Sequence, residues 1–372
     1  MSPLHEIARK RSRVAEFLGR HDLDAVVLTR RANFAWLTAG CVNHVGQSTD
    51  GGVVTLVATP DEVCCVASAI EAPRMRAEEL RGRGIEVVEY PWHDAAAMSR
   101  TWADVIGGRR AAFDIPVPGL PGGLAALPSG FDELRWSLCE AEEQRYRELG
   151  RETGTALQEV CRAVCPGQSE HEVAAALARR LHAKGIRTPV VLIAADDRID
   201  TYRHPLPSER RIDRRVMVVV GAEKYGLHCS ATRLMSFEAL GGELRRRHDA
   251  VVRVDARMIA ETRPGRTLGD VFAAAQRAYA DEGFADEWQQ HHQGGSTGYL
   301  GREVKAGPIC PARIQAHQAF AWNPSITGTK SEDTILVTPH GTEILTYAEG
   351  WPQCEVSAGG CTWARPAILV RS

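Results

Sequence analysis

The sequence predicts an α+β protein with two domains, residues 1–130 and 131–372, and three observations support this. Short β-rich runs alternate with helical patterns in the first third of the chain. The segment Pro116–Gly130, rich in proline and glycine, then interrupts regular structure. After it come helices, a strand pair, more helices, a glycine-rich loop and closing strands. A length of 372 residues allows each domain its own core.

The first domain is expected to hold a small mixed sheet flanked by helices. Runs of β-branched residues bounded by turn residues predict strands, and apolar residues every three or four positions predict helices. The expected strands are Asp24–Thr29, Gly52–Thr59, Val63–Ser68, Glu86–Tyr90 and Arg110–Ile115. The expected helices are Leu4–Arg20, Ile70–Arg81 and Asp94–Ile106.

The second domain is expected to begin with two helices that Pro166 and Gly167 separate, because these residues end a helix. Apolar runs then predict a hairpin with its turn at Ala222–Gly226. The expected helices are Glu140–Val164, Glu170–Lys184, Gly242–Glu261 and Thr267–Glu282. The expected strands are Pro189–Ala195, Val216–Gly221, Leu227–Phe237, Gln318–Trp322, Glu332–Thr338 and Glu343–Thr346.

Composition excludes several classes of function. The net charge of −2 and the pI of about 6.7 give no basic field for nucleic acid or anionic lipid. No stretch approaches the roughly 20 apolar residues of a membrane span, and the polar start has no apolar signal core. Ten cysteines without a CxxC pair are typical of reduced thiols rather than a zinc site. We expect a cytoplasmic protein that binds neither nucleic acid nor membrane.

Four segments resemble one known family in their order and spacing: Val216–Arg233 (VMVVVGAEKYGLHCSATR), His291–Pro308 (HHQGGSTGYLGREVKAGP), Trp322–Thr338 (WNPSITGTKSEDTILVT) and Gly341–Thr346 (GTEILT). The sequence is identified as a member of the creatinase, aminopeptidase P and prolidase family. This resemblance implies a creatinase-like α/β domain followed by a pita-bread domain, and a homodimer.

Peptidases of this family hold two metal ions with two Asp, one His and two Glu. Adjacent divalent ions need bridging carboxylates and an imidazole to balance their charge. Only one of the five positions keeps such a residue here, so we expect no bound metal and no cofactor. The five positions fall on Val219, Ser230, Gly295, Asn323 and Glu332.

The segment Thr201–Ser208 (TYRHPLPS) resembles the family segment that carries a histidine, which falls on His204. The resemblance implies that His204 is the proton-transfer group, as in creatinase, which works without metal. An imidazole suits that role because its ordinary pKa lies near 6.5. The alternative is a histidine that is simply hydrogen-bonded beside a proline turn.

Other polar residues are expected to converge on the same pocket. Glu332 and Glu303 would join His204 as catalytic groups and hold the cationic part of a substrate. Arg233 and Arg302 are candidate carboxylate clamps. The alternatives are that Arg233 pairs only with Glu332 and that Glu303 only supports the sheet. The remaining candidate substrate contacts are His228, Ser230, His291, His292 and Asn323.

Two further expectations concern nucleophiles and the partner subunit. Ser230 would need His204 as its base, whereas Cys229 should face the other side of the strand. In homodimeric relatives the first domain caps the partner's site, which makes Asn33, Trp36 and His44 the candidate contributors.

Together these observations predict a metal-independent, creatinase-like hydrolase that cleaves a C–N bond in a small polar or zwitterionic substrate, such as an amidine, guanidino compound or amide. A lyase reaction in the same pocket remains open. One alternative is a non-catalytic binding protein that keeps the pocket. Another is a metal-dependent Xaa-Pro peptidase with ligands moved to His228, His291 or His292.

Overall fold

The computed structural model describes residues 2–371, which form two compact units. The first comprises the chain up to Arg135 together with Cys139–Glu142, and the second comprises Trp136–Leu138 and the chain from Glu143 onward. Both units combine helices with sheets, which confirms the predicted α+β class. No helix among the described residues is long and apolar enough to cross a membrane.

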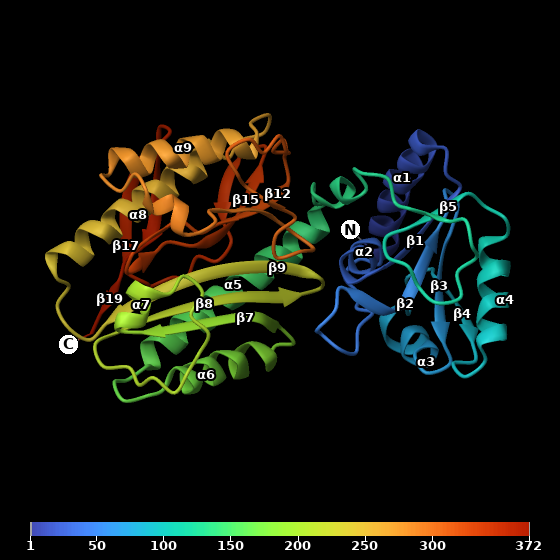
Figure 1. Ribbon diagram of the computed structural model, residues 1–372, viewed down its shortest axis with the longest axis horizontal. Coiled ribbons are helices and arrows are strands. Elements are labelled where there is room, and N and C mark those ends of the chain that lie inside the picture. Colours follow the sequence, from blue (N-terminus) through green and yellow to red (C-terminus); the bar gives the residue numbers. More distant parts are fainter. Residues whose placement is uncertain (1, 372) are drawn as a thin grey trace. The chain divides into compact units, whose positions relative to one another are not determined.

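The first unit is built on a six-stranded sheet with the strand order β4-β3-β2-β1-β5-β6 (Figure 1). The central strand β1 pairs antiparallel with β2 and parallel with β5, so the sheet is mixed as predicted. The strands are β1 (Ala25–Arg30), β2 (Gly51–Ala58), β3 (Val63–Ser68), β4 (Glu86–Tyr90), β5 (Ala111–Phe113) and β6 (Ala125–Ala126). The helices are α1 (Pro3–His21), α2 (Arg31–Leu37), α3 (Ala72–Arg74) and α4 (Ala95–Ile106).

Capping residues explain where α1 begins, whereas a second helix was missed. Ser2 caps α1 by accepting a hydrogen bond from the backbone N–H of His5, and Pro3 occupies the first turn, where its missing N–H costs nothing. Helix α2 was not predicted, and it buries Asn33 and Trp36. The Asn33 side chain contacts Asp114 and Arg135 within this unit. Asn33 and Trp36 are therefore internal packing residues, contrary to the expectation that they reach a partner's site.

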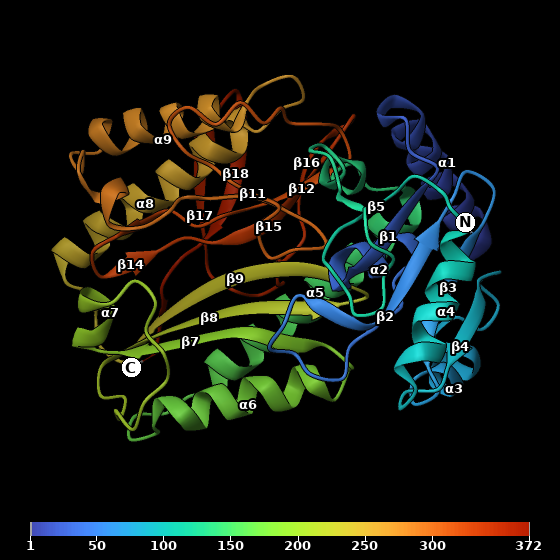
Figure 2. The same ribbon diagram turned by 45° about the vertical axis from the view of Figure 1, so that its right-hand side comes forward.

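The second unit contains a four-stranded sheet with the order β19-β9-β8-β7. Helices α5 and α6 lie along one side of its strands (Figures 1 and 2). The predicted turn at Ala222–Gly226 is shorter in the structure, because β8 continues to Lys224 and only Tyr225 and Gly226, both with positive φ, form the turn. The elements are α5 (Glu140–Ala163), α6 (Glu170–His182), β7 (Arg187–Ala195), α7 (Asp197–Thr201), β8 (Arg215–Lys224), β9 (Leu227–Ser236) and β19 (Leu369–Val370).

A five-stranded sheet with the order β11-β10-β12-β15-β16 completes this unit, and α8 and α9 pack beside each other against it (Figure 2). The interface is an apolar core that includes Val251, Phe272, Phe320 and Ile335. The hairpin of β17 and β18 was not predicted. The elements are α8 (Gly242–Glu261), α9 (Leu268–Asp281), β10 (Gly294–Thr297), β11 (Val304–Lys305), β12 (Gln318–Trp322), β13 (Ser325–Ile326), β14 (Thr329–Lys330), β15 (Asp333–Thr338), β16 (Gly341–Ile344), β17 (Gln353–Ala358) and β18 (Cys361–Pro366).

Candidate active site

A cavity of about 210 Å³ lies within the second unit, and it brings together most of the predicted site residues. Its size suits a small molecule, since drug-sized pockets usually span ~300–1,000 Å³. Four of the five positions at which the resemblance places metal ligands line it. The lining side chains that carry polar groups are His204, His228, Ser230, His292, Arg302, Asn323, Lys330 and Glu332.

The strands explain why these positions meet. Ser230 on β9 pairs with Gly221 on β8, two residues beyond Val219. The pairing of Trp322 with Asp333 places the next residue of one strand, Asn323, beside the preceding residue of the other, Glu332. Segments far apart in the sequence thus converge on one cavity wall.

Gly295, the fifth position, cannot accept a side chain in this backbone. Its φ is +153°, and a Cβ atom there would lie 2.0 Å from the carbonyl oxygen of Val304. A histidine at this position would therefore require β10 and β11 to move apart.

Lys330 is a candidate site residue that the sequence interpretation missed. It is only 5 % exposed, and its Nζ lies 2.8 Å from Oε2 of Glu332, the single carboxylate retained among the five positions. The terminal nitrogen of Arg302 lies 3.6 Å from the other oxygen, Oε1. Thr232 also donates to Oε2, at 2.6 Å. Lys330 could have been found from the sequence, because it is two positions before Glu332 and residues two apart in an extended chain share one face.

The two cations dominate the electrostatics of Glu332. Burial alone would raise the pKa of this carboxyl, but Lys330 and Arg302 outweigh burial and hold the pKa below its ordinary value. Glu332 is therefore ionised and already neutralised, which is contrary to the expectation that it receives the cationic part of a substrate. With two cations and one carboxylate, the charged lining residues leave one net positive charge.

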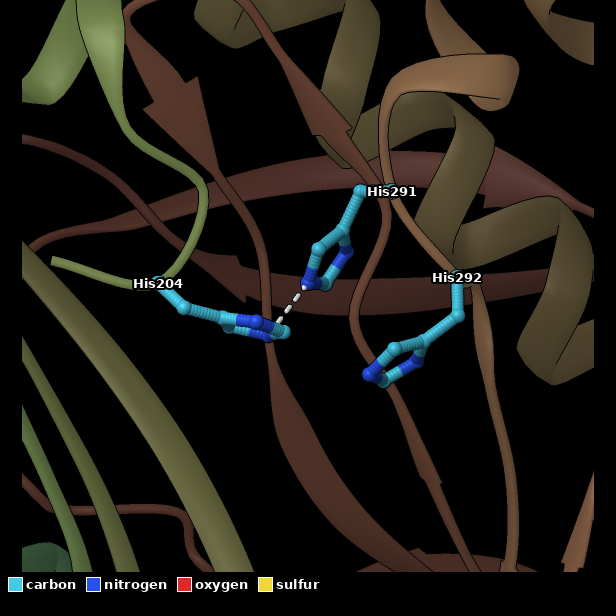
Figure 3. A group of neighbouring side chains, drawn as sticks. All are labelled: His204, His291 and His292. Atoms are coloured by element: carbon cyan, nitrogen blue, oxygen red, sulfur yellow. Dashed lines mark hydrogen bonds between the residues drawn. The ribbon is translucent and has the colours of Figure 1, made fainter.

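Three histidines meet beside these cations (Figure 3). The Nε2 atoms of His204 and His291 lie 3.0 Å apart, and the rings of His291 and His292 stack with centroids 4.4 Å apart. Burial, followed by the charge of Lys330, lowers the pKa of His291 to about 2. Burial, followed by the charge of Arg302, lowers the pKa of His292 to about 4. Burial and Lys330 also lower the pKa of His204, so all three rings are neutral near pH 7.

The family's pair of metal ions does not fit these residues. Val219 offers no donor atom, Gly295 cannot be replaced by histidine without strain, and the ammonium of Lys330 occupies the remaining carboxylate. Two divalent cations here would face Lys330 and Arg302 with a single negative charge between them.

The three histidines are a poor alternative metal site, although their candidate ligand atoms lie within 4.8 Å of one another. His292 Nδ1 accepts from the N–H of Gly294, so its outer nitrogen carries the proton in the neutral ring. His291 Nδ1 has no hydrogen-bond partner among the described residues, whereas metal-binding histidines usually donate there to a carboxylate or carbonyl. The nearby charges on His291 are the cations Lys330 and Arg203.

Three predicted site residues do not line this cavity: Arg233, Glu303 and His291, of which His291 lines a small neighbouring pocket. Thr232 lies on the same face of β9 as Ser230, which lines the cavity, so Arg233 faces the opposite side, where its guanidinium binds Asp333 at 3.0 Å and is almost fully buried. Glu303 is absent from the cavity lining, and its carboxylate accepts from the N–H of Tyr299 at 3.0 Å. The expectations that Arg233 clamps a substrate carboxylate and that Glu303 is catalytic are therefore not supported.

Cys229 and the glycine loop have structural roles. The thiol of Cys229 lies 3.3 Å from Thr153 on α5, and burial raises its pKa to about 12, so it is a poor nucleophile. The backbone of Gly294–Thr297 forms the ladder of β10 with β11 and β12. The N–H of Gly298 bonds to Leu300. These contacts leave the loop few free donors for a developing negative charge.

Comparisons with known proteins agree with this architecture. The profile of "Metallopeptidase family M24" matches residues 144–339. The chain is 25% identical over 368 residues to "Probable dipeptidase PepE" of Mycobacterium tuberculosis, covering 87% of this chain and 96% of that protein. It is 25% identical over 199 residues to "Xaa-Pro dipeptidase" of Pyrococcus horikoshii, covering 50% of this chain and 55% of that protein.

Solved structures show the same fold at low sequence identity. The prolidase from Pyrococcus horikoshii OT3 superposes with a TM-score of 0.77 at 18% identity, covering 92% of this chain and 99% of that one. Dipeptidase PepE from Mycobacterium ulcerans gives 0.77 at 20% identity and covers 99% of both chains. The predicted creatinase-like domain and pita-bread domain are thereby confirmed as a fold.

Proposed function

The chain belongs to the metallopeptidase family M24, and from this premise we propose that it hydrolyses a C–N bond in a small polar molecule without the family's pair of metal ions. The observation that carries the proposal is the ion pair of Lys330 with Glu332 at the position of the metal ligands. The ammonium supplies positive charge where the family uses divalent cations, and it needs no additional ligand residues.

His204 is the proton-transfer group in this proposal. It lines the cavity, is neutral near pH 7, and contacts His291 through Nε2. In the tautomer in which His204 donates to His291, the Nδ1 atom of His204 keeps a free lone pair for a proton from water. The same atom then returns the proton to the leaving nitrogen.

The charge that develops during water attack is stabilised by Lys330 and Arg302. Water adds to the carbonyl-type carbon, and the electron pair of the C=O or C=N bond moves onto the heteroatom. Both cations lie at the cavity wall, where burial strengthens their interaction with a new negative charge. When the C–N bond breaks, the electron pair leaves with the nitrogen, which takes the proton from His204.

The test is an activity screen of the purified protein with dipeptides, N-acyl amino acids, amidines and guanidino acids, with mass-spectrometric detection of products. We expect turnover that survives a strong chelator and that falls ~100- to 10,000-fold in His204→Ala. His340→Ala, at an exposed turn, is the matched control and should retain full activity. Activity that requires added metal would instead support the metallopeptidase alternative, and binding without turnover would support the non-catalytic one.

A further inference from the structure

The cavity position that holds cations in the metal-dependent relatives has a reversed charge in this chain. The carboxylates that would attract metal ions are replaced by neutral residues at Val219, Ser230 and Asn323. Two cationic side chains, Lys330 and Arg302, flank the carboxylate that remains. The wall therefore repels cations, and its excess charge attracts anions.

Both cations keep donor capacity that no described residue uses. An ammonium has three N–H donors, and the partner that the structure gives to Lys330 is Glu332. The Nε atom of Arg302 is buried without a hydrogen-bond partner among the described residues. One terminal nitrogen of Arg302 donates to the Gly301 carbonyl at 2.6 Å, and the other, at 3.6 Å from Glu332, is beyond ordinary hydrogen-bond length. Buried donors of this kind are costly unless a ligand or water accepts from them.

We propose that Lys330 and Arg302 form an oxyanion-binding subsite at the former metal position. The ligand is a small oxyanion that accepts hydrogen bonds from both side chains while Glu332 keeps them oriented. Two sources share this chemistry: the carboxylate of a bound substrate, which is planar, and the tetrahedral oxyanion that water attack creates. The catalytic use of the subsite rests on the proposed function, whereas anion binding itself does not.

Binding is measured by isothermal titration calorimetry on the full chain, with acetate as the planar probe and inorganic phosphate and methylphosphonate as the tetrahedral probes. At least one class should bind at one site per chain. Tighter binding of methylphosphonate than of acetate assigns the subsite to the tetrahedral oxyanion, and the reverse order assigns it to a substrate carboxylate. If no probe binds at millimolar concentration, or if zinc binds in this cavity instead, the subsite does not exist.

Two variants distinguish an effect of charge on anion binding from an effect of a disturbed fold, because charge alone is expected to change binding in opposite directions. Lys330→Met removes a cation and should weaken binding of the preferred probe about ten- to hundredfold. Glu332→Gln removes the competing negative charge, leaves both cations, and should tighten binding. A purely structural role for the ion pair would weaken binding in both variants, which would overturn the proposal. Lys184→Met, an exposed lysine outside the cavity lining, is the control and should change nothing.

The outcome is independent of whether the chain is a hydrolase. Anion binding with no turnover of any tested substrate would leave the subsite standing and contradict the proposed function. If turnover depends on His204 but no probe anion binds, or if anion binding does not depend on Lys330, the proposed function would stand and the subsite would be contradicted.

Discussion

Glu332 and Asp333 are neighbours in the sequence, both are buried, and each faces two cations, yet they serve different regions of the second unit. Asp333 points into the core, where its two oxygens contact Arg233 at 3.0 Å and Arg365 at 2.9 Å. Arg365 also contacts Asp255 at 2.6 Å. This network has no access to the cavity, and its charges hold β9, β15, β18 and α8 together.

Glu332 contacts Lys330 and Arg302 at the cavity wall instead, and these cations keep unused donors. Both carboxylates are compensated, but only one cluster has an excess of charge facing an open volume. Burial and ion pairing therefore do not by themselves distinguish an ion cluster that stabilises the fold from one that can bind a ligand. Buried guanidinium nitrogens without a hydrogen-bond partner among the described residues occur in both clusters, at Arg302 and at Arg233 and Arg365, so what separates the clusters is whether a ligand can reach those donors.

The largest expected effect comes from removing the core carboxylate. Asp333→Ala leaves Arg233 and Arg365 short of a buried partner, which typically costs ~3–5 kcal/mol of unfolding free energy. Urea unfolding followed by circular dichroism measures this loss. Glu332→Gln is the matched comparison, and it should cost clearly less because Lys330 lines a cavity that water can enter. Equal losses in the two variants would remove the distinction between the two clusters.

The alternation of side chains along a strand explains which site residues could be predicted from the sequence. The positions of Ser230 and Glu332 followed from short motifs, and both line the cavity. Arg233 was placed in the pocket although it is one residue beyond Thr232, and adjacent residues of a strand face opposite sides. Lys330 shares a face with Glu332, so its role was accessible from spacing alone.

The pairing of His204 with His291 was not accessible from local pattern. The two residues are 87 positions apart, and their contact depends on how the loop before β8 folds over the end of the 3-10 turn Glu287–Gln290. Motifs placed each histidine near the site, but only tertiary packing brings their rings into contact and determines their charge state.

A smaller effect is expected from restoring the family's histidine at position 295. In Gly295→His the new Cβ collides with the Val304 carbonyl, so strain of ~1–3 kcal/mol should lower the unfolding free energy. No metal should be gained, because Lys330 still neutralises Glu332. Elemental analysis of the purified variant and its urea unfolding curve measure both effects. Gly241→His, where the added Cβ meets nothing within 4 Å, is the control. Stoichiometric zinc in the Gly295 variant would show that the cavity can bind a cation, which would contradict its proposed preference for anions.

The smallest expected effect at neutral pH is a pH dependence of stability that arises from His291 beside the cavity. Burial and Lys330 hold the pKa of His291 near 2, while the unfolded chain titrates near 6.5. Below about pH 6.5 the unfolded state therefore binds a proton that the folded state rejects, so stability falls as the pH decreases. The slope from this one group is at most ~1.4 kcal/mol per pH unit.

Replacing His291 by glutamine should remove that contribution, so the unfolding free energy of His291→Gln should decline less steeply than that of the unaltered protein between pH 6 and pH 4. His340→Gln, at an exposed turn, should leave the slope unchanged. Identical slopes in all three proteins would mean that His291 accepts a proton in the folded state. The cations around it would then not control the charge of the cavity, and the contrast with the Asp333 network would lose its electrostatic basis.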